Sequence, residues 1–137
     1  MKKMDIFGYQ VEIDEEGTRE WYNKANQWGC ECEGCKHFID LAIKRELPTE
    51  VLETLEEFGI APEKATYVCK ILTEEEQSLY QFSYRIAGNI LSDEVDDVNC
   101  LGKCCHEIYP HGAPGFPTPH FDLEFWVRLP RIERGAK

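Results

Sequence analysis

Apolar residues recur with the period of an amphipathic helix through much of the first half of the chain. The spacing predicts three helices, over residues 18–28, 34–47 and 49–58, each with one apolar stripe and one polar face. Thr18 is a suitable N-cap for the first helix, and Pro48 ends the second. The first half of the chain is therefore predicted to be mainly helical.

The period of the pattern changes to two in four other segments. Alternating apolar and polar residues predict strands at residues 6–13, 67–72, 80–90 and 121–129. Residues 92–120 are weakly periodic and rich in Asp, Gly and Pro, which indicates a functional loop or a short element without a clear pattern. Strands thus dominate the second half.

These elements predict an α+β fold in one domain, residues 1–137. An N-terminal strand and two to three short helices are expected to pack on an antiparallel sheet. Each of the two longest strands has a second, polar face, made of Gln81, Ser83, Arg85 and Asn89 in one strand and of Asp122, Glu124, Trp126 and Arg128 in the other.

Acidic residues outnumber basic ones, and this imbalance restricts the partners of the protein. The chain has 26 Asp and Glu against 15 Lys and Arg, a formal net charge of −11. Nucleic acids and anionic membrane surfaces repel such a protein, so neither is expected as a partner. The charge is compatible with a basic protein partner, although it also serves simply to keep a surface soluble.

The sequence contains no sign of export or of membrane insertion. No apolar h-region follows residues 1–6, and no window approaches the roughly 20 apolar residues of a membrane span. The count of seven cysteines is odd, so at least one thiol stays free in a monomer. Closely spaced cysteines without an export signal are typical of a reducing compartment, and a cytoplasmic location is expected.

Cysteine and histidine gather in two clusters that lie far apart in the sequence. The candidate metal ligands are Cys30, Cys32, Cys35, Cys104, Cys105 and His106. Thiolate and imidazole are ligands that zinc prefers, so zinc is the expected ion. The first cluster has a C-x-x-C turn but only His37 nearby as a fourth ligand, and helical spacing points His37 away from Cys35. The second cluster could supply the fourth ligand of a tetrahedral site through Cys104, Cys105 or His106, although the paired C-x-x-C spacing usual for zinc is absent.

Three interpretations of the cysteines stay open. They bind a metal, they pack as small apolar side chains, or Cys32 and Cys35 act in redox or nucleophilic chemistry. A place in the first turn of a helix favours the thiolate of Cys35, whereas the carboxylates of Glu31 and Glu33 disfavour it. The acidic flank favours a metal ligand over a free nucleophile, because coordination deprotonates a thiol outright.

Four common catalytic and nucleotide-binding motifs are absent from the sequence. Walker A, G-x-S-x-G, H-E-x-x-H and G-x-G-x-x-G after a strand are missing, and no catalytic or cofactor-binding residue is predicted. Residues 93–97 are acidic but lack the spacing of a calcium loop. Cys69 is expected to pack in the core, and His111 and His120 to be solvated loop residues. The sequence leaves enzymatic activity undecided and favours a non-enzymatic domain.

One set of short motifs resembles a family of small uncharacterised bacterial proteins. The motifs that carry this resemblance are Trp21-Tyr22, Cys30-x-Cys32-x-x-Cys35-x-x-Phe38, Phe58-Gly59-Ile60 with Pro62, Tyr80-Gln81-Phe82, Gly88-Asn89-Ile90 and Leu123-Glu124-Phe125. The resemblance spans most of residues 20–130 and implies a bacterial cytosolic source and one α+β domain. It implies no activity, and the Cys104-Cys105-His106 cluster departs from the family pattern.

The leading hypothesis from the sequence is a non-enzymatic domain, stabilised by a cysteine-ligated zinc, that acts by binding another protein. One alternative is a thiol-dependent enzyme or redox sensor that uses Cys32 and Cys35. Another is an acidic immunity or inhibitor protein against a basic toxin. In that case Trp126, with Asp122 and Glu124 on the same strand face, would form an aromatic anchor surrounded by acidic groups.

Overall fold

The computed structural model describes residues 1–92, 102–105 and 113–130.

The first helix begins where an aspartate caps it. Helix α1 (Glu15–Lys24) starts after Asp14, whose carboxylate accepts the backbone N–H of Gly17 at 2.9 Å. The predicted N-cap, Thr18, is instead a buried residue within the helix. The chain leaves helical geometry at Ala25, so the prediction of a helix extending to residue 28 was wrong.

The second helix ends earlier than its apolar pattern suggests. Helix α2 (Glu33–Ile43) stops because Arg45 takes a left-handed conformation with φ of 61°. The N–H groups of Arg45 and Glu46 bond the carbonyls of Ala42 and Leu41, which is a Schellman motif with arginine at the place glycine usually takes. Helix α3 (Thr49–Glu57) and the short 3-10 helix η1 (Pro62–Lys64) follow.

The N-terminal segment forms a hairpin. Strands β1 (Lys2–Ile6) and β2 (Tyr9–Ile13) pair antiparallel, with Ile6 opposite Tyr9. Both residues of the connecting turn have positive φ, 53° at Phe7 and 87° at Gly8, as a tight hairpin turn requires. The prediction of one continuous strand over residues 6–13 was therefore wrong.

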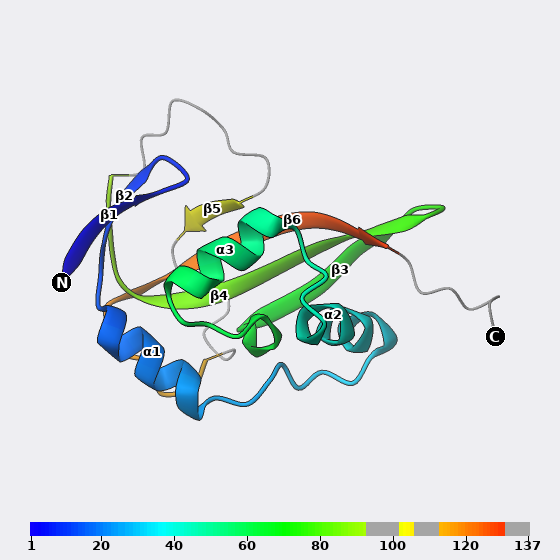
Figure 1. Cartoon of the computed structure of the whole chain (residues 1–137), viewed down its shortest axis with the longest axis horizontal. Helices are drawn as coiled ribbons and strands as arrows, with labels where there is room; N and C mark the ends of the chain where they lie inside the picture. The colour runs from blue at the N-terminus through cyan, green and yellow to red at the C-terminus, as the bar shows by residue number, and fades with distance from the viewer. Residues whose placement is uncertain (93–101, 106–112, 131–137) are drawn as a thin grey trace.

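A long strand, β4, organises the rest of the sheet. The remaining strands are β3 (Tyr67–Thr73), β4 (Gln77–Ser92), β5 (Gly102–Cys105) and β6 (His120–Pro130). One edge of β4 pairs with β6 from Gln77 to Ala87, and β6 pairs with β5. The other edge pairs first with β3 and then with β2 (Figure 1). The sheet is antiparallel in every pair, and β5 is the short element hidden in residues 92–120.

A glycine allows β4 to pass from one partner to the next. Gly88 has φ of 144°, and a Cβ atom built on it would lie 2.0 Å from the carbonyl oxygen of Glu12. The close approach of the β2 and β4 backbones thus requires a residue without a side chain.

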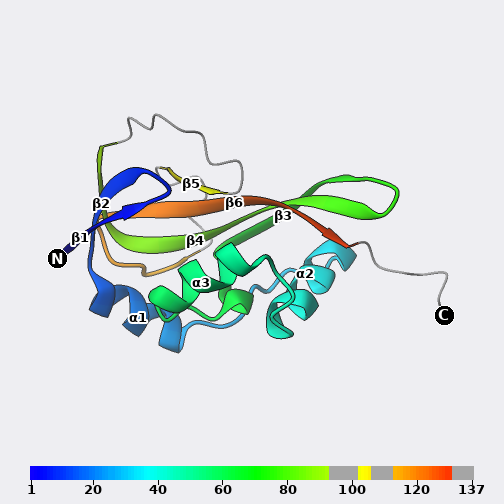
Figure 2. The same cartoon turned by 45° about the horizontal axis from the view of Figure 1, so that its top comes forward.

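The three helices cover one face of the sheet (Figure 2). Alternate residues of β4 and β6 form the core beneath them, where Phe38 of α2 packs on Phe82 with ring centroids 4.8 Å apart. Tyrosine hydroxyls fasten the helical layer to the sheet: Tyr80 donates to the carbonyl of Gly34 at 2.9 Å, and Tyr22 donates to the carbonyl of Arg85 at 2.7 Å. The described residues therefore form one α+β domain, and the predicted fold class is confirmed.

The opposite face of β4 and β6 buries charged side chains. Arg85 and Asp122 face each other across the strands, each 2% exposed, and the Nε atom of Arg85 donates to Oδ1 of Asp122 at 2.9 Å. The carboxylate of Glu124 is also buried and accepts from Nε2 of Gln81 and Nε1 of Trp126, both at 2.6 Å. Hydrogen bonding and ion pairing make this burial tolerable.

This burial contradicts one interpretation from the sequence. Trp126 is 38% exposed, but Asp122 and Glu124 are each 2% exposed and satisfied by internal partners. They cannot surround Trp126 with acidic groups that a basic partner would meet. The acidic anchor predicted around Trp126 was therefore wrong.

Candidate metal centre

Three cysteines converge at the N-terminus of α2. Cys30 and Cys32 lie on the exposed segment before the helix, and Cys35 lies in its first turn and is buried. The sulfur atoms of the three residues all lie within 4.8 Å of one another. Cys32 is the N-cap of α2, and its sulfur accepts the backbone N–H of Cys35 at 3.4 Å. The helix end therefore fixes two of the three sulfurs relative to each other.

A tryptophan and strand β3 enclose the innermost sulfur. The indole N–H of Trp28 donates to Sγ of Cys35 at 3.3 Å, and the ring of Trp28 packs edge-on against Tyr67 of β3. On the other side, Sγ of Cys35 lies 4.0 Å from the carbonyl oxygen of Val68. The backbone N–H of Trp28 bonds the carbonyl of Glu63 at 2.9 Å and holds the preceding loop in place.

Cys32 and Cys35 lie in different environments, which shift their pKa values in opposite directions. The pKa of Cys32 is lowered from its ordinary value, chiefly because the backbone N–H of Cys35 donates to its sulfur. Burial raises the pKa of Cys35 to about 12. The redox alternative needs an exposed thiolate of lowered pKa, and helical position favoured Cys35 for that role; the structure instead lowers the pKa of the exposed Cys32, because Cys35 is buried.

The donor set fits a thiophilic metal ion. Tetrahedral zinc with bonds of about 2.3 Å to sulfur places neighbouring sulfurs about 3.8 Å apart. The sulfurs here lie within 4.8 Å of one another before any ion is bound, so small rotations of exposed side chains would close them on one centre. A bound ion would also remove the burial penalty of Cys35, because it stabilises the thiolate directly. The group could hold a metal ion.

The second predicted cluster lies elsewhere in the fold. Cys104 and Cys105 are on β5, which β6 and β4 separate from the β3 strand beside Cys35. Cys104 is buried with its sulfur 3.9 Å from the carbonyl oxygen of Ile6, and burial raises its pKa to about 12. Sγ of Cys105 lies 3.3 Å from Oε2 of Glu124. Among the described residues, neither joins the three-cysteine group. His106 lies outside the described residues.

Histidine supplies no further ligand in the part of the chain that the structure describes. His37 is half-buried, and its Nε2 atom lies against the carbonyl oxygen of Pro130. His120 is half-buried, with Nδ1 at 3.0 Å from the carbonyl of Pro117 and its ring edge-on to Phe116. Residues 93–97 and His111 lie outside the described residues. Cys69, expected in the core, is half-buried on β3.

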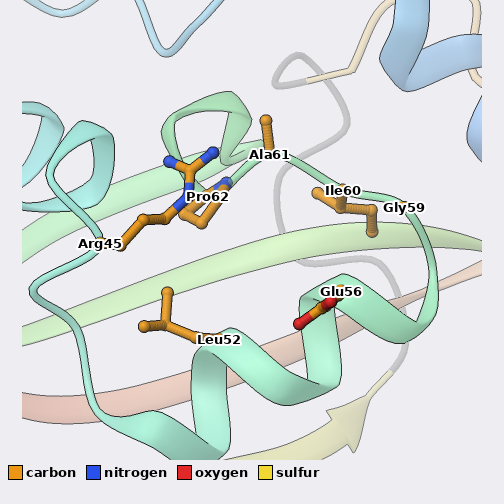
Figure 3. A pocket seen from close by; sticks show the side chains of 7 residues that line it. All are labelled: Arg45, Leu52, Glu56, Gly59, Ile60, Ala61 and Pro62. Atoms are coloured by element: carbon orange, nitrogen blue, oxygen red, sulfur yellow. The ribbon is translucent and has the colours of Figure 1, made fainter.

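A cavity of about 450 Å³ opens between α3 and the segment that follows it (Figure 3). Leu52 of α3 and, across from it, Ile60 and Pro62 line it with apolar surface, and its charged groups are Arg45 and Glu56. The guanidinium of Arg45 is already bound to the carbonyl of Ala42 at 2.7 Å and to Oε1 of Glu63 at 3.0 Å. Those contacts give Arg45 a structural role at the end of α2.

Sequence reasoning missed Trp28 as a partner of the thiols. Trp21, Ala25 and Trp28 are spaced four and three residues apart, which predicted that they share one face of a helix. The chain has already left the helix at Ala25. The seven-residue separation of Trp28 and Cys35 carries no recognisable motif, so only the three-dimensional structure brings them together.

Comparison of the chain with protein-family models, with curated proteins and with solved structures found no match. The resemblance to a family of small bacterial proteins therefore stays a prediction. Among the helices in the described residues, none is both long and apolar enough to cross a membrane.

Proposed function

We propose that this protein binds one zinc ion through Cys30, Cys32 and Cys35, and that the metal-stabilised domain acts by binding another protein. The convergence of three sulfur atoms within 4.8 Å at one helix N-terminus carries the metal-binding part. Zinc accepts thiolate ligands, and the positive end of α2 favours the negative charge of a thiolate cluster. A cytoplasmic location belongs to the same proposal, because a reducing compartment keeps such thiols available.

Metal content tests the proposal directly. The full chain, purified without chelator, should contain about one zinc ion per molecule, because three convergent thiolates bind zinc tightly at neutral pH. Elemental analysis by mass spectrometry measures the ratio. Cys32→Ser should lose most of the metal, whereas Cys69→Ser, which alters a thiol outside the group, should keep it. Less than about 0.2 equivalents of zinc or iron in the unaltered chain would reject the metal centre.

A second candidate function is thiol–disulfide exchange with a protein disulfide. The observation that favours it is the pairing of an exposed, N-capping Cys32 with a buried Cys35 three residues later. The Cys32 thiolate attacks one sulfur of the partner disulfide and displaces the other as a thiolate. Cys35 then loses its proton to solvent, attacks Cys32 and releases the second thiolate of the partner. The partner gains two electrons, and Cys32 and Cys35 lose two by forming a disulfide.

Alkylation rates test this second function. In metal-free protein, Cys32 should react with iodoacetamide at a lower pH than an ordinary thiol, because its pKa is lowered, and Cys35 should stay protected well above neutral pH. Peptide mass spectrometry over a pH series gives the rate at each cysteine. In urea, where the hydrogen bond and the burial are lost, the two rates should converge. Faster alkylation of Cys35 than of Cys32 in the folded protein would exclude the exchange mechanism.

The protein partner remains a prediction from charge. A chain with net charge −11 associates fastest with basic surfaces, and salt screens that attraction. An immunity role against a basic toxin is one form of this proposal, although the buried Asp122 and Glu124 contribute nothing to its interface.

A further inference from the structure

A cavity of about 270 Å³ adjoins the three-cysteine group. Cys30 belongs to both the group and the cavity wall. Trp28 and Ile39 supply apolar surface, and Lys36 and Glu31 are the charged residues that line it. The cavity thus has both polar and apolar walls, is large enough for a small molecule and lies next to one of the three sulfurs.

The described residues offer three ligands where zinc prefers four. Within the described ranges, the group that could hold a metal ion contains no fourth Cys, His, Asp or Glu. Structural zinc sites are normally closed by four protein ligands, whereas sites that keep three protein ligands bind an exogenous molecule in the fourth position. The ligand count and the adjoining cavity point to the second kind.

We propose that the fourth coordination position of the metal is open to the cavity beside Cys30 and takes the sulfur of a small thiol. This inference rests on the proposed zinc site and adds the class of ligand that the site would recognise. On binding, the thiol loses its proton to solvent and its thiolate displaces water from the metal, with no oxidation or reduction.

The chemistry of the site favours a thiol over a harder ligand. A metal already held by three thiolates is in a soft environment, and sulfur is the donor that matches it. Four thiolates on a divalent ion carry a net charge of −2, which needs a nearby cation. Lys36 lines the cavity with its side chain exposed, whereas Glu31 opposes it, so Lys36 is the group that offsets the added charge. The volume restricts the ligand to a small molecule.

Cobalt substitution tests the open position, because Co(II) adopts zinc-like geometry and reports its ligands by absorption. Titration of the Co(II)-loaded full chain with 2-mercaptoethanol should change the visible bands saturably. The sulfur-to-cobalt charge-transfer intensity should rise from that of three thiolates to that of four. Ethylene glycol, of similar size but without sulfur, should have no effect.

Two charge-matched variants locate the ligand. Lys36→Gln should weaken 2-mercaptoethanol binding about two- to fivefold, since an exposed cation near the thiolate is lost. Lys44→Gln, at the opposite end of α2 and paired with Asp40, should leave the affinity unchanged. Equal affinities in both variants would place the thiol outside the cavity and overturn the inference.

The outcomes separate this inference from the zinc site itself. A Co(II) spectrum of four chain ligands that does not respond to 2-mercaptoethanol would reject the open position and leave the metal site intact. Failure of the chain to bind Co(II) or zinc at all would reject both.

Discussion

Replacing Arg85 by methionine should lower the free energy of unfolding by about 3–5 kcal/mol. The Arg85 guanidinium donates to both oxygens of Asp122, at 2.9 and 3.3 Å, and both side chains are almost fully buried. Loss of the cation leaves the Asp122 carboxylate in the interior of the protein without its main counter-charge. Urea unfolding monitored by circular dichroism measures the change.

An exposed ion pair on the same sheet provides the matched control. Nε of Arg128 lies 2.8 Å from Oε1 of Glu74, with side chains 52% and 41% exposed. Arg128→Met should therefore cost at most about 1 kcal/mol. The double variant Arg85→Met with Asp122→Leu should recover much of the loss, because it removes the unpaired charge as well. Equal losses for Arg85→Met and Arg128→Met would mean that burial does not determine the cost.

The elements of the fold followed from periodicity, but their ends did not. The alternation of Tyr9, Val11 and Ile13 continues back to Phe7, so the apolar pattern does not show that Phe7 and Gly8 form a turn between two strands. Only Gly8 hinted at the reversal. Similarly, the apolar pattern continued past Ile43, while the left-handed conformation of Arg45 ended α2. Apolar patterning reports which residues share a face, and backbone conformation decides where an element stops.

Burial on the second face of the sheet could not be predicted from residue type. Arg85, Asp122 and Glu124 alternate with apolar residues, which is the pattern of a solvated strand face. Register places Arg85 opposite Asp122, and that pairing compensates the charges when the face is covered. Such a pairing depends on which residues of two distant strands meet, and the sequence of either strand alone does not contain it.

The three-cysteine site was predictable because it is local. Cys30, Cys32 and Cys35 lie within six residues, so a turn entering a helix brings their sulfurs together wherever the rest of the chain lies. The order of their acidities was not predictable, since it depends on burial against Val68 and Trp28. Cys104 and Cys105 were grouped with them on chemistry alone. The sheet places both on β5, which β6 and β4 separate from β3 beside Cys35.

Cys32→Ser should lower the free energy of unfolding of the zinc-loaded protein by about 4 kcal/mol. A lost ligand that weakens zinc affinity on the order of 1,000-fold removes that much stabilisation at saturating metal. Thermal or urea unfolding with excess zinc measures it. Cys35→Ser should lose at least as much, but part of its loss comes from a hydroxyl placed in a buried site. Cys32 is exposed and therefore gives the cleaner result.

The capping role of Cys32 makes this variant a sharp test. Serine is among the best N-cap residues, so Cys32→Ser preserves or improves the start of α2 and removes only the sulfur. In the presence of a chelator, the variant and the unaltered protein should be equally stable to within about 1 kcal/mol. Cys69→Ser, on β3 outside the group, keeps all three sulfur ligands, so any stability it loses should be the same in excess zinc and in chelator. A Cys32→Ser protein as stable as the unaltered chain in excess zinc would show that its sulfur holds no ion.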